Sequence, residues 1–391
     1  MVCSGVSVGE KGMYGEDDSN DAGRLRTSVS IDLGALEENY RALVGLVQAR
    51  VTFLCVIKAD AYGHGAVQVG RRLESLGAAY FGVATVGEGK ELRKEGIRAP
   101  ILILSGVMPW EQLEALIDYD LTAAVGTFDM LERVAAFRGR RPLKVHVKID
   151  TGMGRLGFGA DDLDGLARRL KALRGVEIEG VMSHFPASER RDDRGLRQVA
   201  RFTESLELLK ENGIEPKLVH MANSAAICNY PEAHFTMVRP GIMLYGSYPG
   251  KALQERLDLK PVMKWTSYVS FVRTFPSGTA LSYGGTYVTE RETRVAYVPV
   301  GYADGYPRAL SNRGCVLVAG RRCRIAGTVC MDWVLIDVTG LPGVGPGEEV
   351  IVLGSEKGGT ITADEIAEQA GTIPYEVLCN VSRRITRRYV S

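Results

Sequence analysis

A lysine stands at the end of an apolar run near the start of the chain. Residues 51–57 are almost entirely apolar, and Lys58 follows within the stretch "VIKADAYGHG". An amine held at the end of a buried strand can form an imine with a carbonyl cofactor. A lysine that simply leaves the core for solvent is the more common explanation of such a pattern, so Lys58 alone does not decide between the two.

Other polar and charged side chains follow later apolar runs. They are Ser105, Asp150 with "TGMGRLG", His184 in "SHF", Asn223 and Ser224 in "MANSAA", and Arg239 in "VRPGI". Small polar residues often end strands and indicate little by themselves. A lysine, a histidine and two arginines, Arg155 and Arg239, gathered at one edge would instead suit an anionic ligand.

The alternation of side chains along the predicted strand "VHVKID" places another cation, Lys148, at the same site. In a strand, the valines would share one face while His146, Lys148 and Asp150 share the other. Lys148 should therefore point into the fold, close to Arg155. Two cations that close in a low-dielectric site need an intervening anion, for which Asp150, a bound ligand and a modified lysine are the alternatives.

The first two-thirds of the chain alternates strand-length apolar runs with amphipathic stretches. The predicted strands are 51–57, 80–84, 101–104, 121–125, 143–149, 177–182, 217–221 and 237–238, and the predicted helices include 65–76, 87–95, 110–118, 161–173 and 195–212. This alternation over about 200 residues indicates an α/β fold with a (β/α)8 TIM barrel, where chemistry collects at the C-terminal ends of the strands. A doubly wound open sheet is the competing layout, but no GxGxxG follows the first strand.

From about Lys264 the pattern changes to short or alternating strands separated by glycine and proline. This is typical of a mainly antiparallel β domain. One helix is predicted there, at about 361–370, after the N-cap candidate Thr362.

The predicted domains are therefore a disordered extension at 1–26, a barrel at 27–260 that carries Lys58, and a β-rich domain at 261–391. The run at 28–33 is a lone strand ahead of the barrel's first helix. That strand could pair with a strand of the C-terminal domain.

Composition narrows the class of protein. A formal net charge of +1 gives no basic field for nucleic acid, and the apolar runs are too short to cross a membrane. The residues before the first strand lack the apolar core of a signal peptide. The chain has 7 cysteines without a CxxC pair, so we expect neither a metal site nor disulfides, and a cytoplasmic location.

Motifs spread over nearly the whole chain resemble those of bacterial alanine racemases. They are "VIKADAYGHG", "HVKIDTGMGRLG", "SHF", "MANSAA", "VRPGIMLYG", "SYGGTY", "VPVGYADGYPR", "GTVCMDW" and "PYEVLCNVSRR", and they run in family order from about residue 28 to 388. Each motif alone is weak, but the full set is highly specific. The resemblance implies a barrel followed by a β domain, pyridoxal 5′-phosphate as cofactor, and a homodimer.

The resemblance also assigns roles to individual residues. Lys58 would hold the cofactor covalently, Arg239 would face its pyridine nitrogen, and Arg155 would bond its phenolic oxygen. The phosphate would be held by Tyr62, Ser224, Gly241, Ile242 and Tyr375, while His184 would link Tyr283 to Arg239. Met331, Tyr302 and Arg155 would contact the substrate, and Asn223 and Asp332 would support the site. In relatives the lysine matching Lys148 is often carbamylated, which would place an anion beside Arg155.

The implied reaction interconverts L-alanine and D-alanine by a two-base mechanism, which supplies D-alanine for bacterial peptidoglycan. Lys58 would serve one face of the substrate, and Tyr283 of the partner subunit would serve the other, so that active sites are shared between subunits. A racemase of serine or of a broad range of amino acids is the nearest alternative. A decarboxylase of this fold and a non-catalytic pyridoxal-phosphate-binding protein are the more distant ones.

Overall fold

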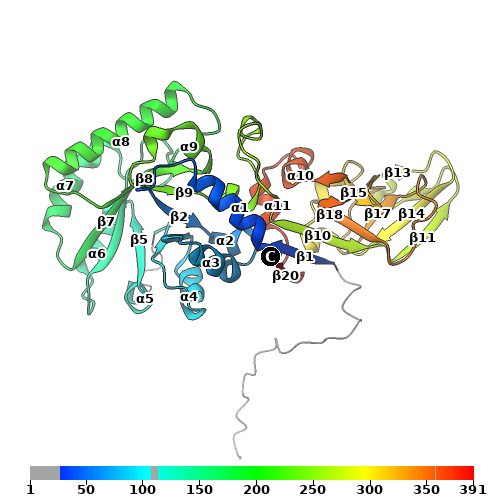
Figure 1. The fold of residues 1–391 in the computed structure, drawn as a ribbon, viewed down its shortest axis with the longest axis horizontal. Helices are drawn as coiled ribbons and strands as arrows, with labels where there is room; N and C mark the ends of the chain where they lie inside the picture. The colour runs from blue at the N-terminus through cyan, green and yellow to red at the C-terminus, as the bar shows by residue number, and fades with distance from the viewer. Residues whose placement is uncertain (1–26, 107–112, 357) are drawn as a thin grey trace, which may run out of the picture.

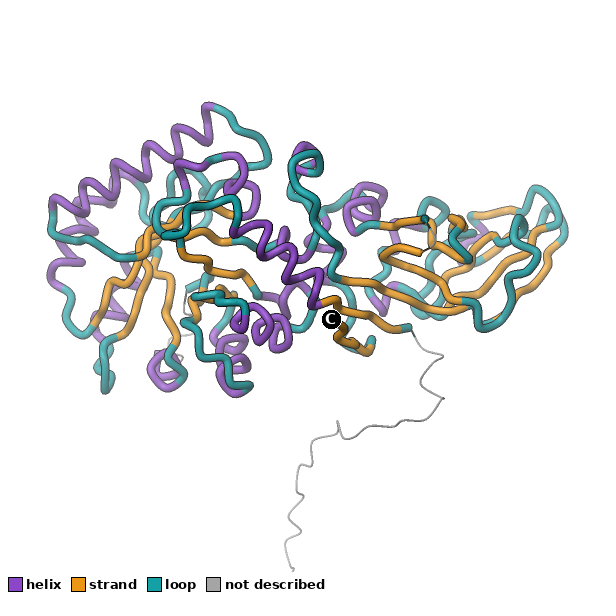
Figure 2. Tube along the Cα trace, viewed as in Figure 1, coloured by secondary structure: helices purple, strands orange, loops and turns teal. Residues whose placement is uncertain are grey.

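The computed structural model describes residues 27–106, 113–356 and 358–391. The extension predicted at 1–26 and the first residues of the helix predicted at 110–118 lie outside this part of the chain. Figure 1 shows two bodies side by side, a helix-covered barrel and a β-rich body, and Figure 2 shows that helices concentrate in the first.

Eight parallel strands close into a barrel. They are β2 (Thr52–Val56), β3 (Tyr80–Val83), β4 (Ile101–Ile103), β5 (Leu121–Val125), β6 (Leu143–Lys148), β7 (Val176–Met182), β8 (Leu218–Asn223) and β9 (Met237–Arg239). The circle closes because β9 pairs with β2. β3, β4 and β5 are buried along their whole length, as expected for parallel strands covered by helices on the outside and side chains on the inside. The predicted TIM barrel is confirmed.

Helices follow the strands and cover the outside of the barrel (Figure 1). They are α1 (Leu33–Val44), α3 (Ala66–Ser75), α4 (Val86–Lys94), α5 (Leu113–Asp118), α6 (Phe128–Ala136), α7 (Leu163–Ala172), α8 (Asp193–Glu211) and α9 (Ser224–Asn229). The short segment α2 (Lys58–Tyr62) follows β2 and is a turn at the end of the barrel. Several helices begin with a side-chain cap: Thr85 forms a reciprocal capping box with Glu88 at α4, and Thr127 caps α6. These caps satisfy backbone donors at the helix starts and so define where each helix begins.

The second body is built from antiparallel sheets. Its strands are β10 (Met263–Tyr268), β11 (Phe271–Phe275), β12 (Ala280–Leu281), β13 (Tyr287–Val288), β14 (Thr293–Val298), β15 (Cys315–Val318), β16 (Arg321–Arg324), β17 (Val334–Asp337), β18 (Glu349–Glu356), β19 (Gly359–Ile361) and β20 (Thr386–Val390). Two helices, α10 (Ala363–Ala370) and α11 (Pro374–Cys379), complete it. α10 begins after Thr362, whose hydroxyl accepts a hydrogen bond from the Glu365 N–H at 3.0 Å. The predicted antiparallel β domain is confirmed.

The two ends of the described chain meet in the largest sheet. β1 (Ser28–Asp32) pairs antiparallel with β10 and parallel with β20, and Asp32 then caps α1. Residues ahead of the barrel in sequence therefore lie within the β-rich body. Asn39 on α1 strengthens the junction, because its amide donates to the carbonyls of Leu244 and Lys260 and its oxygen accepts from the Lys260 N–H.

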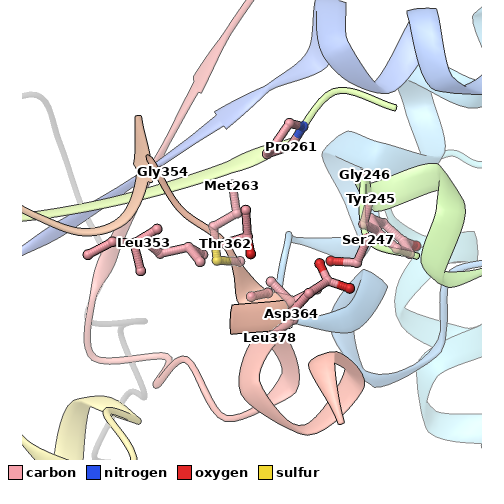
Figure 3. A pocket seen from close by; sticks show the side chains of 12 residues that line it. Tyr245, Gly246, Ser247, Pro261, Met263, Leu353, Gly354, Thr362, Asp364 and Leu378 are labelled. Carbon is pink, nitrogen blue, oxygen red and sulfur yellow. The ribbon is translucent and has the colours of Figure 1, made fainter. Parts of the chain in front are cut away.

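A small cavity of about 20 Å³ lies in this junction, between the end of the barrel and β10, β18 and α10 (Figure 3). The Asp364 carboxylate faces Ser247 there and accepts a hydrogen bond from the Tyr248 N–H at 3.4 Å. Burial raises the pKa of Asp364. The cavity is small and its lining carries no cation, so we regard this site as structural. No helix of the described residues is long and apolar enough to span a membrane.

Replacing Asp364 with Asn should stabilise the protein near pH 7. A carboxyl whose pKa is raised on folding favours the folded state at low pH, and this contribution is lost as the pH rises through the folded-state pKa. Asn keeps an acceptor for Tyr248 and removes the buried charge. We expect the melting temperature of Asp364→Asn to exceed that of the parent at pH 7 and to converge with it near pH 4. Glu368→Gln, on the exposed face of the same helix, is the control; an equal gain there would contradict the explanation.

Candidate active site

A cavity of about 680 Å³ opens at the C-terminal ends of the barrel strands. Eleven residues to which the family resemblance assigns a role line it: Lys58, Tyr62, Lys148, Arg155, His184, Asn223, Ser224, Arg239, Gly241, Ile242 and Tyr375. Ten come from the barrel, and Tyr375 comes from α11 of the second body. Side chains far apart in sequence thus share one space large enough for a cofactor and a small substrate.

The backbone after Lys58 forms a left-handed turn. Ala59, Asp60, Ala61 and Tyr62 have φ values of 52°, 55°, 53° and 53°, a region that costs about 1–2 kcal/mol for each residue other than glycine. Strain of this kind persists only where surrounding contacts impose it, and such places are often functional. The turn swings Tyr62 back into the cavity that Lys58 lines.

Acidic side chains hold this turn from outside. Glu88 accepts from the Ala59 N–H at 2.7 Å, and Asp60 accepts from the Ala66 N–H at 2.8 Å. Glu88 also accepts from the Ala84 N–H, so it ties the turn to the end of β3. A carboxylate that accepts backbone N–H groups forms stronger hydrogen bonds than a neutral acceptor would.

His64 holds the same turn from inside. It is fully buried, and its Nδ1 lies 2.9 Å from the Ala61 carbonyl and 3.0 Å from the Tyr62 carbonyl. Its ring stacks on Tyr245. Burial lowers the pKa of His64 to about 4, so the neutral ring donates from Nδ1 to these carbonyls. The sequence alone left His64 unassigned; its contacts make it a brace for the Lys58 turn.

Positive charge dominates the cavity. Burial lowers the pKa of the Lys58 amine, and Arg155 lowers it further, although Glu88 opposes the effect. Lys148 is buried, and burial together with Arg155 and Arg239 lowers its pKa to about 8. Lys148 thus points inward, as the alternation in "VHVKID" indicates. Both amines are more readily deprotonated than a lysine in water.

Asp150 shapes the loop that presents Arg155. Its Oδ1 accepts from the N–H groups of Gly152 and Met153 at 2.8 and 2.7 Å, and its Oδ2 accepts from that of Gly154 at 2.7 Å. Asp150 raises the pKa of Lys148, but less than burial and the two arginines lower it. Its main structural role is therefore to hold the loop, and it only partly offsets the cations.

Arg239 lies buried at the end of β9, and four groups accept its hydrogen bonds. Nη2 donates to the Ser183 carbonyl at 2.7 Å, to His184 Nδ1 at 3.0 Å and to the Met221 carbonyl at 3.1 Å. Nη1 donates to His220 Nδ1 at 2.9 Å. Burial and Arg155 lower the pKa of Arg239 to about 9. Burial and Arg239 itself lower the pKa of His184 and His220 well below the usual value, so both rings are neutral acceptors.

One corner of the cavity collects hydroxyl groups and a close-lying backbone. Ser224 Oγ accepts from the Gly241 N–H at 2.8 Å, and the ring centroids of Tyr62 and Tyr375 are 5.8 Å apart. A Cβ at position 241 would lie 2.8 Å from Tyr62 Oη, so any other residue there would displace the Tyr62 hydroxyl. Burial raises the pKa of both tyrosines, that of Tyr375 to about 12, so both remain hydroxyl donors. Asn223 supports this corner by capping α9 and accepting from Ser188.

Four predicted site residues do not line the cavity. Tyr283, Tyr302, Met331 and Asp332 all lie in the second body. The first three are exposed by 70%, 42% and 53%, which is unusual for such large apolar side chains. Asp332 forms an ion pair with Arg384 at 2.8 Å. Within one chain, the structure does not bring these residues to Lys58.

The exposed Tyr283 nevertheless has a rigid base. Ser282 before it has φ 62° and ψ −175°, a strained conformation for a residue with a side chain. Ser282 Oγ donates to the Thr328 carbonyl at 2.6 Å, and Thr328 Oγ1 donates to the Tyr283 carbonyl at 2.8 Å. The backbone is therefore fixed while the phenol projects from the surface.

Sequence reasoning missed several residues that contact the site. Glu88 and His64 hold the Lys58 turn, and His220 accepts from Arg239. His64 and His220 carried a signal, because both are histidines close to candidate residues in otherwise apolar stretches. Glu88 carried none, because its contact depends on the spacing of two neighbouring strands.

Replacing Ala59 with Gly should stabilise the protein. Ala59 is exposed, so little packing is lost, and glycine adopts a φ of 52° without the Cβ penalty. We expect the free energy of unfolding to rise by about 0.5–1 kcal/mol in urea titrations. Ala200→Gly, at an exposed position in the interior of α8, should lower it by a similar amount. A loss of stability in Ala59→Gly would contradict the strain that we assign to the turn.

Comparisons with known proteins agree with this architecture. Residues 31–249 match the family model described as "Alanine racemase, N-terminal domain", and residues 262–389 match "Alanine racemase, C-terminal domain". The chain is 41% identical over 372 residues to an alanine racemase of Geobacter sulfurreducens, covering 93% of this chain and 97% of that protein. It is 45% identical over 369 residues to one of Carboxydothermus hydrogenoformans, covering 92% and 98%.

Solved structures show the same likeness. The alanine racemase of Bacillus anthracis with bound L-Ala-P superposes with a TM-score of 0.88 at 34% identity, over 94% of this chain and 95% of that one. The enzyme of Streptomyces lavendulae gives a TM-score of 0.87 at 35% identity, over 94% and 97%. The chain therefore belongs to the alanine racemase family of enzymes.

Proposed function

We propose that this protein interconverts L-alanine and D-alanine with pyridoxal 5′-phosphate as cofactor. The observation that carries the proposal is the cavity in which the Lys58 amine, the buried Arg239 and the hydroxyl corner at Ser224 come together. Family membership supports the same activity.

The lining residues fit this cofactor. An amine of lowered pKa suits covalent attachment to an aldehyde, since the neutral amine is the reactive form. Ser224, Tyr62, Tyr375 and the backbone at Gly241 and Ile242 would hold the phosphate. Arg155 would bond the phenolic oxygen. The chemistry supplied by the bound cofactor is delocalisation of the negative charge that forms when the amino acid loses its Cα proton.

Arg239 would face the pyridine nitrogen. A guanidinium donates hydrogen bonds but rarely releases a proton, so it would leave that nitrogen largely unprotonated. The acceptors around Arg239 fix its plane, and His184 would extend this network toward Tyr283. This arrangement favours return of a proton to the substrate carbon over side reactions such as transamination.

Racemisation requires a proton donor and acceptor on each face of a planar carbon. Lys58, once freed from the cofactor, would serve the D-alanine face. Tyr283 would serve the L-alanine face, and it does not line the cavity of its own chain. We therefore propose a homodimer in which each cavity receives Tyr283, Tyr302 and Met331 of the partner subunit. Their exposure together with that of Phe271 and Trp333 is consistent with a surface that a second copy covers.

Substrate recognition would use Arg155 and Met331 for the carboxylate, with Tyr302 nearby and Asp332 supporting the loop through Arg384. A cytoplasmic enzyme of this kind would supply D-alanine for peptidoglycan. Racemisation of serine or of several amino acids remains the alternative that the same cavity allows.

Shared active sites make a sharp prediction for mixed dimers. Racemisation can be followed as the decrease in the circular dichroism of an L-alanine solution. Lys58→Ala and Tyr283→Phe, each tested alone, should have lost most of this activity. Co-expressed with different tags and purified as a mixture, they should regain about a quarter of wild-type activity, because random pairing gives half heterodimers with one intact site of two.

The contrary outcome is equally clear. If Lys58 and Tyr283 act within one chain, no pairing of these variants restores a site, and the mixture stays inactive. Tyr287→Phe, also a tyrosine of the second body, is the control and should keep activity alone and in every mixture. If the wild-type protein with cofactor leaves the circular dichroism of L-alanine unchanged, the proposed reaction is wrong.

Lys148 should carry a carbamate. Its pKa of about 8 means that the neutral amine, which is the form that reacts with carbon dioxide, becomes more abundant as the pH rises toward and past 8. The product would be an anion between Arg155 and Arg239. We expect a carbamate signal in carbon-13 NMR after incubation with labelled bicarbonate, growing from pH 6.5 to 8.5.

A matched pair of variants on β6 identifies the residue. Lys148→Gln should lose the carbamate signal, whereas Lys144→Gln, whose amine lies at the surface of the same strand, should retain it. A signal that survives in Lys148→Gln would mean that another amine is modified.

A further inference from the structure

A line of hydrogen bonds leads from Arg239 Nη1 across the inside of the barrel. Arg239 Nη1 lies 2.9 Å from His220 Nδ1, and His220 Nε2 lies 2.7 Å from His146 Nδ1. His146 Nε2 lies 3.2 Å from Glu179 Oε2. The four residues come one each from β9, β8, β6 and β7, which are neighbours in the barrel (Figure 1).

The two ends determine where each proton in this line sits. Arg239 can only donate, so His220 Nδ1 must be unprotonated and its Nε2 carries the hydrogen. His146 Nδ1 must then accept, so its Nε2 also carries the hydrogen and donates to Glu179. Burial lowers the pKa of both histidines, which is consistent with neutral rings. Every bond in the line therefore points from the guanidinium to the carboxylate.

Glu179 is kept ionised. Burial would raise its pKa, but hydrogen bonds from His146 and Tyr80 outweigh burial and lower the pKa to about 2. Tyr80 donates to Glu179 Oε2 at 2.7 Å, and Thr122 lies 3.2 Å from the same oxygen. Three donors thus converge on one carboxylate oxygen.

None of the four groups that accept from Arg239 carries a negative charge. A buried guanidinium without a counter-ion is costly, so a carboxylate reached through two polarisable rings is electrostatically useful. Besides His146, the charged group that lowers the pKa of Glu179 is Lys144. For His146, Glu179 raises the pKa and Arg239 lowers it.

The barrel is shaped to admit the two rings. A Cβ at Gly180 would lie 2.8 Å from His146 Nδ1 and Cε1, so the imidazole occupies space that any other residue there would fill. The pairing of β6 with β7 shifts register at His146, and the pairing of β8 with β9 shifts after His220. Regular barrel strands filled with apolar side chains would need neither feature.

We propose that Glu179 is the remote counter-ion of Arg239, and that His146 and His220, each held as the Nε2–H tautomer, connect the two as positioning residues for the reaction. The line fixes the plane of the guanidinium and keeps its acceptors neutral, so that Arg239 presents a constant donor to the cavity. The inference rests on the proposed function only for what Arg239 faces; the tautomers and the counter-ion stand without it.

The test is nitrogen-15 NMR of histidine-labelled protein, with and without cofactor. The chain has only 5 histidines, which single substitutions can assign. We expect unprotonated Nδ1 and protonated Nε2 at both His146 and His220. Glu179→Gln keeps an acceptor for His146 and Tyr80 but removes the charge, so both Nε2 proton signals should move upfield. Glu177→Gln, an exposed carboxylate on the same strand, is the matched control and should move neither.

Kinetics of the holoenzyme give a second measurement. We expect kcat of Glu179→Gln to fall about tenfold, the effect of weakening a charge-assisted hydrogen bond, with KM for alanine unchanged within about twofold. Tyr80→Phe removes one donor and no charge, so it should shift the same signals less, and it replaces Glu179→Gln if that variant fails to fold. An Nδ1–H or doubly protonated ring in the parent protein overturns the proposal. So does a loss of kcat in which the histidine signals stay unmoved, because a merely structural role would give that result.

Discussion

Four cationic side chains share one cavity at the rim of the barrel, and their mutual repulsion is the constraint on which the rest of the site depends. Lys58, Lys148, Arg155 and Arg239 line the same space; the two arginines lower the pKa of both lysines, and Arg155 also lowers that of Arg239. In a site of low dielectric constant this repulsion favours neutral amines and anionic ligands. The repulsion between these cations therefore suits the cavity to anionic groups such as phosphate and carboxylate.

The polar groups around these cations act mainly on backbone geometry. Asp150 uses both carboxylate oxygens to hold the loop before Arg155, and Glu88 holds the turn after Lys58. Neither accepts a hydrogen bond from the cation that it helps to place. Carboxylates are thus near enough to fix positions, yet they leave the cationic ends free to bind a ligand. The carboxylates therefore position the cations without neutralising them, whereas a direct salt bridge would do both.

Much of this organisation could be predicted from sequence, because parallel barrel strands have a clear pattern. The apolar runs identified every barrel strand, and alternation in "VHVKID" correctly turned Lys148 inward. The left-handed turn at Ala59–Tyr62 could not be foreseen, since no glycine marks it and tertiary contacts impose it. Glu179 was equally hidden, because its link to Arg239 depends on the relative register of four strands. Tyr283 was identified by family resemblance alone, and no local pattern distinguishes it from a packing residue.

The position of Tyr283 follows from how the two bodies are built. In the proposed reaction, a base that approaches the substrate opposite Lys58 would have little room on the barrel rim, because Arg155, His184 and Arg239 already line the cavity there. A loop of a separate β-rich body can supply it, provided that the loop is rigid before it docks. The strained Ser282 and the hydrogen bond from Thr328 to the Tyr283 carbonyl meet that condition. Because the backbone is fixed in the single chain, little conformational entropy would be lost if the phenol entered the cavity of a partner subunit, and docking of the second body would then set the distance between the two proposed bases.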